Sequence, residues 1–505
     1  MLRGCVQMEI LIQSLIYVLS PMNLLLVVLG TVFGMVCGAL PGLSSSMAII
    51  LALPFTYTME PVSAIVMLVA VYVGGACGGS ISAILLKTPG TPEAVATTFD
   101  GYPLAMKGQA GLALGLAVTA SSFGTIFSAF AMLICAPLLA TLALKFQSAE
   151  YFALALLGLS CITSIGSKNQ MKAVLSAVLG LMFATIGIDS INGIERFAFG
   201  QPFLMNGINY IPVMIGTFAI AEVYKNIEEL GQRDNNTITD AKVSLVLMKM
   251  RDMVKMWATF IKSSIIGTII GIIPAAGGSI AALISYGEAA KSSKTPEKFG
   301  TGCPEGIIAP ESANNAAVGG SMVPTMILGI PGSPTSAVIM AAFMILGLRP
   351  GPLLLREQPI LLNSIFFGLI FSALLLFVVG RFITREFARI LKLPYPMLGT
   401  LIIALGVVGA YSLKNSFYDV IIMFIFSFIG YFFDKFKYSN SAFILGLILG
   451  GIAENSLRKQ IVIGNGSWMG FVSRPISLVI LVMAIFTFIS PLIKARKKTA
   501  NQVSA

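Results

Sequence analysis

The chain carries too few charged side chains to cover the surface of a globular protein. Charged residues make up 11% of its 505 positions and hydrophobic residues 56%, whereas soluble domains contain about 25% charged residues. The rest of its surface must therefore face lipid, which predicts a protein that crosses the bilayer many times. The excess of Lys and Arg, 33 against 22 Asp and Glu, is typical of loops near anionic lipid. No basic run alternates with aromatic residues, so no nucleic-acid partner is predicted.

Residue types that the chain lacks exclude several classes of chemistry. It contains no histidine, which excludes serine–histidine triads and histidine-ligated metals. It contains no G-x-x-x-x-G-K-[ST] sequence, so it carries no phosphate-binding loop for ATP. Its six cysteines show no C-x-x-C spacing and are interpreted as small apolar residues. No cofactor is predicted.

Apolar segments of about 20 residues, the length that crosses the hydrocarbon core, recur along the whole chain. They predict an all-α polytopic membrane protein with about 10–12 transmembrane helices. Some apolar segments are too short to span and lie beside Pro and Gly, which predicts broken or re-entrant half-helices. The first segment, 8–20, has no small-x-small cleavage site and is predicted to be an uncleaved helix. The candidate segments are 8–20, 22–40, 43–54, 61–77, 110–144, 150–165, 171–188, 203–224, 257–273, 276–290, 312–330, 334–348, 360–380, 396–412, 417–433, 439–453 and 474–493.

One long polar stretch divides the chain into two halves. It holds six basic residues and is predicted to be cytoplasmic, as is the basic C-terminal tail. The predicted organisation is an N-terminal membrane half (1–224), a cytoplasmic linker (225–256) and a C-terminal membrane half with the basic tail (257–505).

The two halves share a first motif. The first half has "GALPGLSSSMAIILALPF" and the second has "GIIPAAGGSIAALISYGE". Pro41 then matches Pro274, and Ser46 matches Ser279, with the same spacing in both copies. We expect an inverted repeat, in which span 22–40 runs inward and span 257–273 runs outward, so that both motifs meet near the midplane.

A second motif follows in each half and supports the duplication. It is "GGSISAILLKTPGTP" from Gly78 and "GGSMVPTMILGIPGSP" from Gly319, with one additional residue in the second copy. We expect the GGS sequences to form turns with exposed carbonyl groups. Two ordered motifs that recur together indicate an internal duplication.

Pro and Gly inside apolar segments leave backbone groups unpaired, which membranes tolerate only inside protein or beside a water-lined cavity. A half-helix that starts there offers N–H donors, hydroxyls and the positive end of its dipole to an anion. Broken helices at matching positions of two repeats mark a transporter's substrate site. The alternative interpretation is close helix packing through small residues. The predicted substrate-binding residues are Pro41, Gly42, Ser44, Ser45, Ser46, Gly79, Ser80, Pro274, Gly277, Gly278, Ser279, Gly320 and Ser321.

A few polar residues near these motifs are candidates for binding a coupling ion. Asn314 and Asn315 precede the second GGS sequence, and Glu311 lies one turn earlier. Amide and carboxylate oxygens suit a hard cation such as sodium, although Glu311 could equally belong to a polar loop. Lys87 lies in the apolar stretch "ISAILLKTPG", where a charge is either functional or extends to the membrane surface.

These motifs together resemble a known family. The sequences "PGLSSSMAIILALPF", "GGSISAILLKTPGTPEAVATTFDGYPLAMKGQAGLALG", "GIIPAAGGSIAALISYGEAAKSSK" and "EGIIAPESANNAAVGGSMVPTMILGIPGSPTSAVIMAAFMILGLRPGPLLL" resemble the large (TctA-type) permease subunit of tripartite tricarboxylate transporters, over about Gly30 to Ile493. The resemblance implies a bacterial cytoplasmic (inner) membrane system that takes up a carboxylate and is driven by a sodium or proton gradient. It also implies two partners, a periplasmic solute-binding protein and a small four-helix membrane subunit. The family pattern has a neutral polar residue, usually Asn, where this chain has Lys87, which leaves the identity of the coupling ion open.

Two other functions remain open at this point. A passive anion channel would not need duplicated half-helices. An intramembrane enzyme would need a partner motif for Tyr418-Asp419, and no G-x-G-D sequence occurs. The residues do not name the carboxylate. The loop 453–475, with Glu454, Arg458 and Lys459, is the predicted docking site for the periplasmic partner.

Overall fold

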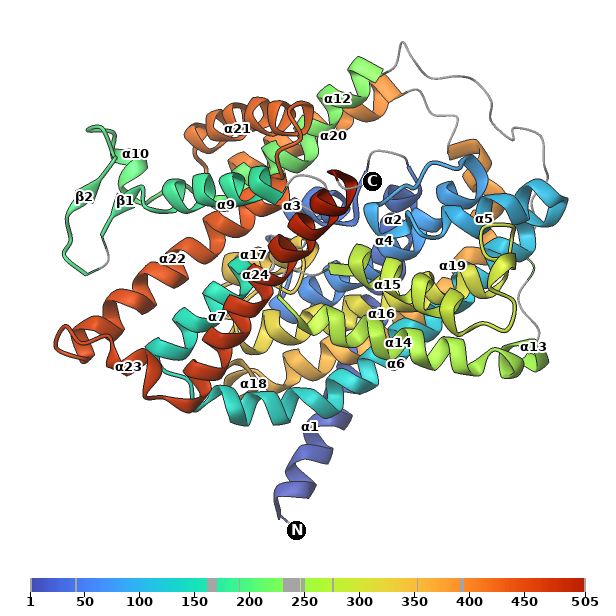
Figure 1. The fold of residues 1–505 in the computed structure, drawn as a ribbon, viewed down its shortest axis with the longest axis horizontal. Helices are drawn as coiled ribbons and strands as arrows, with labels where there is room; N and C mark the ends of the chain where they lie inside the picture. Colours follow the sequence, from blue (N-terminus) through green and yellow to red (C-terminus); the bar gives the residue numbers. More distant parts are fainter. Residues whose placement is uncertain are drawn as a thin grey trace.

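The computed structural model describes residues 2–40, 43–160, 170–189, 191–229, 246, 250–274, 277–351, 353–390 and 395–503. These residues are almost entirely helical (Figure 1). Six of the described helices are long and apolar enough to cross a membrane: Pro21–Ala39, Pro61–Leu86, Thr98–Leu139, Pro359–Gly380, Phe417–Lys435 and Asn440–Ile463. Shorter apolar helices of 10–17 residues accompany them. The prediction of a helical, multi-pass membrane protein is confirmed.

The elements of the first half follow the predicted segments closely. A two-residue β-hairpin, in which Gly187 pairs with Arg196, interrupts them and was not predicted. The elements are α1 (Leu2–Val18), α2 (Pro21–Ala39), α3 (Ser45–Thr56), α4 (Pro61–Leu86), η1 (Pro92–Ala94), α5 (Thr98–Leu104), η2 (Ala105–Gln109), α6 (Ala110–Ala143), α7 (Ser148–Ser160), α9 (Gln170–Ala184), β1 (Gly187–Ile188), β2 (Glu195–Arg196), α10 (Pro202–Met205), α11 (Tyr210–Met214), η3 (Ile215–Ile220) and α12 (Ala221–Glu229).

The second half again begins with two shorter helices before a longer one. Its elements are α13 (Met250–Lys255), α14 (Trp257–Ile272), α15 (Gly277–Ser292), η4 (Pro296–Lys298), α16 (Glu305–Ile327), α17 (Pro334–Ile345), α18 (Leu354–Glu357), α19 (Pro359–Ile390), α20 (Tyr395–Ser412), α21 (Phe417–Lys435), α22 (Asn440–Ile463), α23 (Met469–Val472) and α24 (Pro475–Val503).

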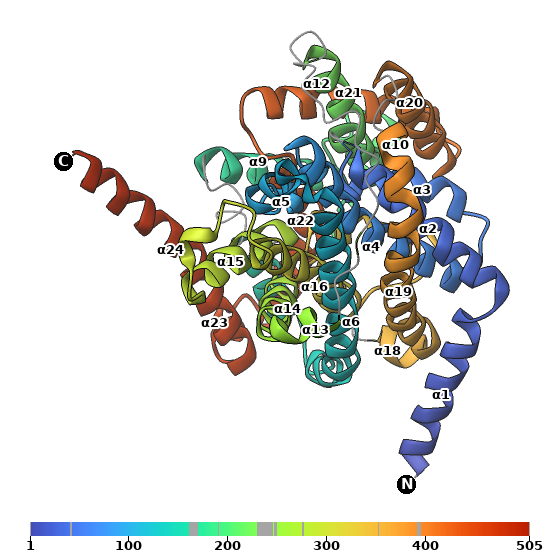
Figure 2. The same ribbon diagram turned by 90° about the vertical axis from the view of Figure 1, so that its right-hand side faces the viewer.

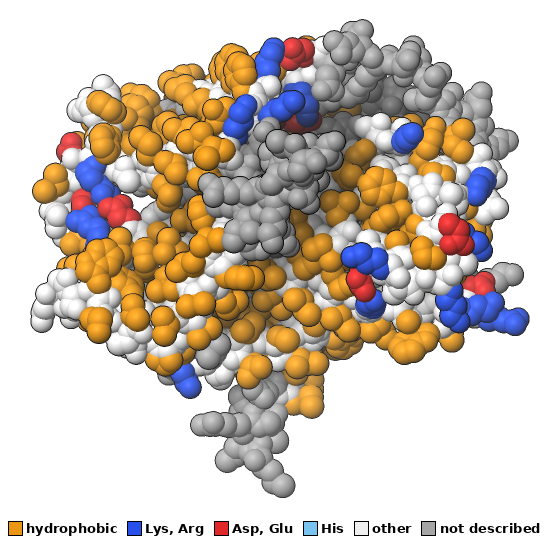
Figure 3. Space-filling view, in the orientation of Figure 1, with side chains coloured by type: hydrophobic (Ala, Val, Ile, Leu, Met, Phe, Trp, Pro, Cys, Tyr) orange, Lys and Arg blue, Asp and Glu red, His pale blue; other side chains and the backbone are white. Residues whose placement is uncertain are grey.

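The outer surface is apolar in the way a lipid-facing surface must be. Hydrophobic side chains cover most of the face in Figure 3, and charged side chains gather in a few small groups. On α21, Ile421, Ile425 and Phe428 recur at helical spacing and are all exposed, and Phe486 on α24 is 71% exposed. Figure 2 shows α1 and α24 standing away from the main body on opposite sides. Exposure of so much apolar surface to water is unfavourable in free energy, so lipid or a membrane partner must cover it.

Equivalent glycines bring equivalent helices together in the two halves. A Cβ atom on Gly34 of α2 would lie 2.2 Å from the carbonyl oxygen of Val71 on α4. A Cβ atom on Gly267 of α14 would likewise lie 2.2 Å from the carbonyl oxygen of Ala313 on α16. Such close contact between backbones is what small residues permit in membrane helices. The sequence duplication therefore corresponds to a duplicated packing arrangement.

Candidate functional site

The long helices α4 and α16 cross antiparallel at the centre of the molecule. Tyr72 on α4 lies 3.4 Å from Ser321 on α16, measured between hydroxyl oxygens. One turn further along α4, the Ala76 carbonyl accepts a hydrogen bond of 3.2 Å from the Asn314 side chain. The expectation that the GGS sequences form turns is wrong, because they lie inside these continuous helices. Their small side chains let neighbouring segments approach closely instead.

The chain leaves helical conformation after α4 and after α16, at the P-G-T-P and P-G-S-P sequences. α4 ends at Leu86, and the chain folds back so that the Gly90 N–H donates to the Gly79 carbonyl over 3.2 Å. After α16, the Gly332 N–H donates to Thr325 Oγ1 over 3.3 Å. Each returning segment then starts a new helix with Pro at its first position, η1 in one half and α17 in the other.

Two helical hairpins reach this centre from opposite ends of the molecule. The start of α2 lies beside the start of α4, since Tyr17 just before it contacts Glu60 just before α4. α14 packs parallel to α16 through Gly267, and α16 runs antiparallel to α4. The start of α14 therefore lies at the end of the molecule opposite to the start of α2. α15 then returns, and Lys262 on α14 pairs with Glu288 on α15 at 2.8 Å. The tips of both hairpins therefore lie in the interior.

A cavity of about 790 Å³ lies between these tips and breaks. The N-terminal ends of four helices, α3, α15, α17 and α22, face it. Each has 12 or more residues, so each directs free N–H groups and a positive dipole end toward the cavity. Such ends bind anions without any basic side chain. The arrangement can hold a molecule with several carboxylates.

Four side chains from both halves form what we call the hydroxyl half-site: Ser44, Ser46, Ser333 and Thr335. Ser46 and Thr335 lie 2.8 Å apart between hydroxyl oxygens. Ser44 caps α3 by accepting the Met47 N–H, and Ser333 caps α17 by accepting the Ser336 N–H. Capping fixes the orientation of both helix ends toward the cavity.

A second part of the lining, which we call the acidic half-site, consists of Thr91, Glu93, Gly278 and Ser279, with Asn314 packed behind Gly278. By the repeat, Thr91 corresponds to Ser333, Glu93 to Thr335 and Ser279 to Ser46. A Cβ atom on Gly278 would lie 2.6 Å from Asn314 Oδ1 and 3.1 Å from Glu93 Cγ. The two side chains therefore converge on one point of the α15 backbone.

Five predicted substrate-binding residues line the cavity: Ser44, Ser46, Gly277, Gly278 and Ser279. The other predicted residues do not line the cavity. Gly79 gives room to Thr91, whose Oγ1 would be 2.3 Å from a Cβ atom at that position. Pro41 and Gly42 lie outside the described residues. The remaining predicted residues, buried in helix contacts or at the hairpin tip, are Ser45, Ser80, Pro274, Gly320 and Ser321.

The predicted ion-binding residues Glu311, Asn314 and Asn315 lie close together on α16, apart from Lys87, and none of the three lines the cavity. Glu311 is fully buried and accepts hydrogen bonds from Thr97 and Ser121. Asn315 is also buried, and its Oδ1 lies 3.4 Å from Thr125 Oγ1. Their role in coupling stays a prediction.

Lys87 lies at the C-terminal end of α4, not inside the helix. Its backbone is left-handed (φ 57°), its side chain is exposed, and Nζ lies 5.6 Å from the centre of the Tyr102 ring. An exposed ammonium near a tyrosine needs no buried partner. Its role in coupling remains untested.

Sequence reasoning missed Thr91, Glu93, Ser333 and Thr335. The sequence contained a signal for them. Thr91 and Ser333 both precede the second Pro of P-G-T-P and P-G-S-P, and Glu93 and Thr335 both follow it. The start of α22 was missed entirely, although Asn440 there is buried and lines the cavity.

Four charged side chains line the cavity besides Glu93. They are Glu222 and Lys225 on α12, Asp434 on α21, and Lys437 two residues after α21. Lys225 lies 3.5 Å from Glu222. The part of the cavity wall formed by α12 and the end of α21 is therefore charged.

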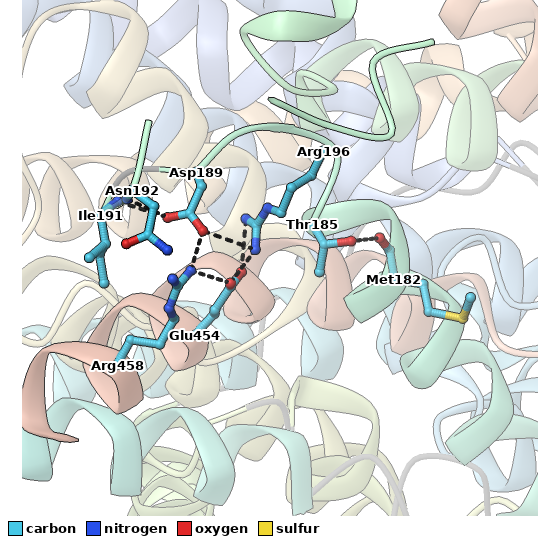
Figure 4. Close-up of polar contacts among 8 residues, drawn as sticks. All are labelled: Met182, Thr185, Asp189, Ile191, Asn192, Arg196, Glu454 and Arg458. Atoms are coloured by element: carbon cyan, nitrogen blue, oxygen red, sulfur yellow. Dashed lines mark hydrogen bonds and ion pairs between the residues drawn. The ribbon is translucent and has the colours of Figure 1, made fainter. Parts of the chain in front are cut away.

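An ion-pair cluster, shown in Figure 4, fastens the β-hairpin to α22. Arg458 and Arg196 each form ion pairs with both Glu454 and Asp189. The Arg458–Glu454 distance is 3.2 Å and the Arg196–Asp189 distance is 3.8 Å. Arg458 and the N–H groups of Ile191 and Asn192 lower the pKa of Asp189 to about 2. The contribution of Asp189 to stability is therefore present above the ordinary carboxyl pKa near 3.9 and is lost as pH falls toward 2.

This cluster corrects the predicted docking loop. Glu454 and Arg458 belong to α22, which continues to Ile463, and both are engaged by the hairpin. Lys459 is exposed and remains available.

Comparison with known proteins agrees with this architecture. The Tripartite tricarboxylate transporter TctA family matches residues 24–445. The chain belongs to this family. An uncharacterized 52.8 kDa protein in the TAR-I ttuC' 3' region of Agrobacterium vitis is 34% identical over 485 residues, 96% of each chain. An uncharacterized protein in the TAR-II ttuC' 3' region of the same organism is 32% identical over 237 residues, 47% of this chain and 98% of that protein. No solved structure matches.

As a TctA-family protein, the chain is the membrane component of a tripartite tricarboxylate transport system, not an enzyme. The family implies a carboxylate substrate and partner subunits. The cavity lined by residues of both halves is the candidate site for that substrate.

Proposed function

We propose that this chain is the large transmembrane subunit of an ion-gradient-driven carboxylate uptake system in a bacterial inner membrane. Its cavity takes the carboxylate that a periplasmic solute-binding protein delivers, and a small four-helix membrane subunit assists. The observation that carries the proposal is the convergence of four helix N-termini on one cavity formed by both halves. A di- or tricarboxylate needs several such donors at once.

The proposal includes an inverted repeat. The approach of the α2–α3 and α14–α15 hairpins from opposite ends supports it, as do the matching contacts at Gly34 and Gly267. In transporters of this kind, alternating access comes from motion of one repeat against the other around a central site.

A passive anion channel is the alternative. A channel needs a continuous path, whereas the cavity is bounded by tightly packed helices such as α4 against α16. Uptake of a labelled tricarboxylate, with citrate as the first probe, into proteoliposomes tests the proposal. The two membrane subunits and the binding protein would be reconstituted together.

Under an imposed sodium or proton gradient we expect accumulation above the external concentration. An ionophore that collapses the gradient should abolish it, and omission of the binding protein should remove uptake at micromolar substrate. Downhill flux alone, unaffected by the ionophore, would favour the channel.

A further inference from the structure

Glu93 is a carboxylate in a cavity built for carboxylates. It lines the cavity, and its Oε2 is buried without a hydrogen-bond partner at normal distance and angle. No Lys or Arg of the described residues forms an ion pair with it. The basic residues that line the cavity are Lys225 on α12 and Lys437 after α21. An unpaired buried carboxylate beside an anionic substrate is costly unless a cation or a proton neutralises it.

A second oxygen nearby is also unsatisfied. Thr91 is 1% exposed, lines the cavity, and its Oγ1 makes no hydrogen bond. Its counterpart Ser333 has its hydroxyl fully engaged, with Ser336 at 3.0 Å and Tyr72 at 2.9 Å. The repeat thus keeps one hydroxyl as a helix cap, whereas the Thr91 hydroxyl lies beside the Glu93 carboxylate and makes no hydrogen bond of normal geometry.

The orientation of Asn314 completes the set. Its Nδ2 donates to the Ala76 carbonyl over 3.2 Å, so its Oδ1 is turned the other way, against Gly278. Gly278 is also where the Glu93 side chain packs. Glu93 and Thr91 line the cavity, and the amide oxygen of Asn314 lies directly behind Gly278, which lines it too.

We propose that Glu93, Thr91 and Asn314 bind a sodium ion beside the substrate carboxylate. All three supply oxygen, the ligand that hard cations prefer, and broken-helix segments are where transporters coordinate sodium. Glu93 supplies the carboxylate of this set, while the nearby Glu311 accepts hydrogen bonds from Thr97 and Ser121. No group of three or more acidic or cysteine residues that could hold a metal ion lies in the described part of the chain. The inference rests on the proposed function only for the role of the sodium ion, which is to couple the ion gradient to uptake. Its test measures sodium binding and does not depend on transport.

The test measures sodium binding to the purified pair of membrane subunits without any substrate. Binding of ²²Na⁺, and thermal stabilisation by NaCl against choline chloride at equal ionic strength, would be measured for wild type and E93Q. Glu288→Gln is the matched control, because Glu288 lies on the surface and pairs with Lys262. We expect saturable binding in wild type and E288Q, and roughly tenfold or greater weakening in E93Q.

Thr91→Val, which keeps the shape and removes one ligand, should weaken sodium binding by a smaller factor. It also serves if E93Q does not assemble. Undiminished sodium binding in both E93Q and T91V would overturn the site. Stabilisation that follows pH but not sodium would also overturn it and would make Glu93 a proton carrier. Failure of uptake with sodium binding intact would instead count against the proposed function.

Discussion

The two half-sites of the cavity have the same backbone plan and different chemistry. In the hydroxyl half-site Ser46 meets Thr335, and the hydroxyls bond to each other. In the acidic half-site Ser279 occupies the position of Ser46, and Glu93 that of Thr335. The two helix breaks are therefore similar, and single-residue differences give only one of them a carboxylate. The comparison suggests that one half holds the anion and the other its counter-cation.

The largest effect should come from giving both halves the same charge. Thr335→Glu places a second carboxylate where the substrate carboxylate is expected. Two unit charges about 4 Å apart repel by about 4 kcal/mol at an effective dielectric near 20, so uptake of citrate should fall by roughly 100-fold or more. Thr335→Val, which only loses the hydroxyl, is the control and should fall much less. Equal losses in both would remove the charge argument.

Serine truncation should distinguish the two halves by degree. Losing one hydrogen bond to a charged group costs about 1.5–3 kcal/mol, which is roughly 10- to 150-fold in affinity. Ser46→Ala should raise the half-saturation concentration within that range, and Ser279→Ala should lie near its lower end. Uptake kinetics measure both, with Ser292→Ala as an exposed control at the end of α15. Wild-type kinetics in both variants would contradict the assignment.

Adding one methyl group should sharpen the comparison further. Ala at Gly278 would crowd Asn314 Oδ1 at 2.6 Å, and overpacking costs about 1–3 kcal/mol. Its counterpart Ser45 already carries a Cβ atom and a hydroxyl without a hydrogen bond, so Ser45→Ala should change little. We expect Gly278→Ala to weaken sodium binding by about tenfold. If the two variants behave alike, the acidic half-site is not closely packed.

The smallest effect is expected at Lys87. The ammonium is exposed beside Tyr102 and lies outside the cavity lining. Lys87→Asn should therefore leave the sodium dependence of uptake within about a factor of two, since surface changes away from a site cost about 0.5 kcal/mol or less. A marked rise in sodium dependence would show that Lys87 substitutes for part of the cation.

Sequence alone predicted most helices of the fold and part of the cavity lining. Ser46 and Ser279 were found because Pro and Gly beside them break helices, and that is a local property. Glu93 was missed because its role depends on the fold-back at Gly90, which brings it to α15. The GGS sequences were misassigned for the opposite reason. Glycine is permitted in both turns and close helix contacts, and only the neighbouring helix decides between them.

The central claim is that both repeats contribute to one substrate cavity. Ser46→Cys and Ser279→Cys, each made in a background without the six native cysteines, would be labelled with a maleimide in the reconstituted complex. The account predicts that citrate slows labelling at both positions with the same concentration dependence, while Ser292→Cys is unaffected. Protection at only one of the two positions, or at neither, would contradict a shared cavity.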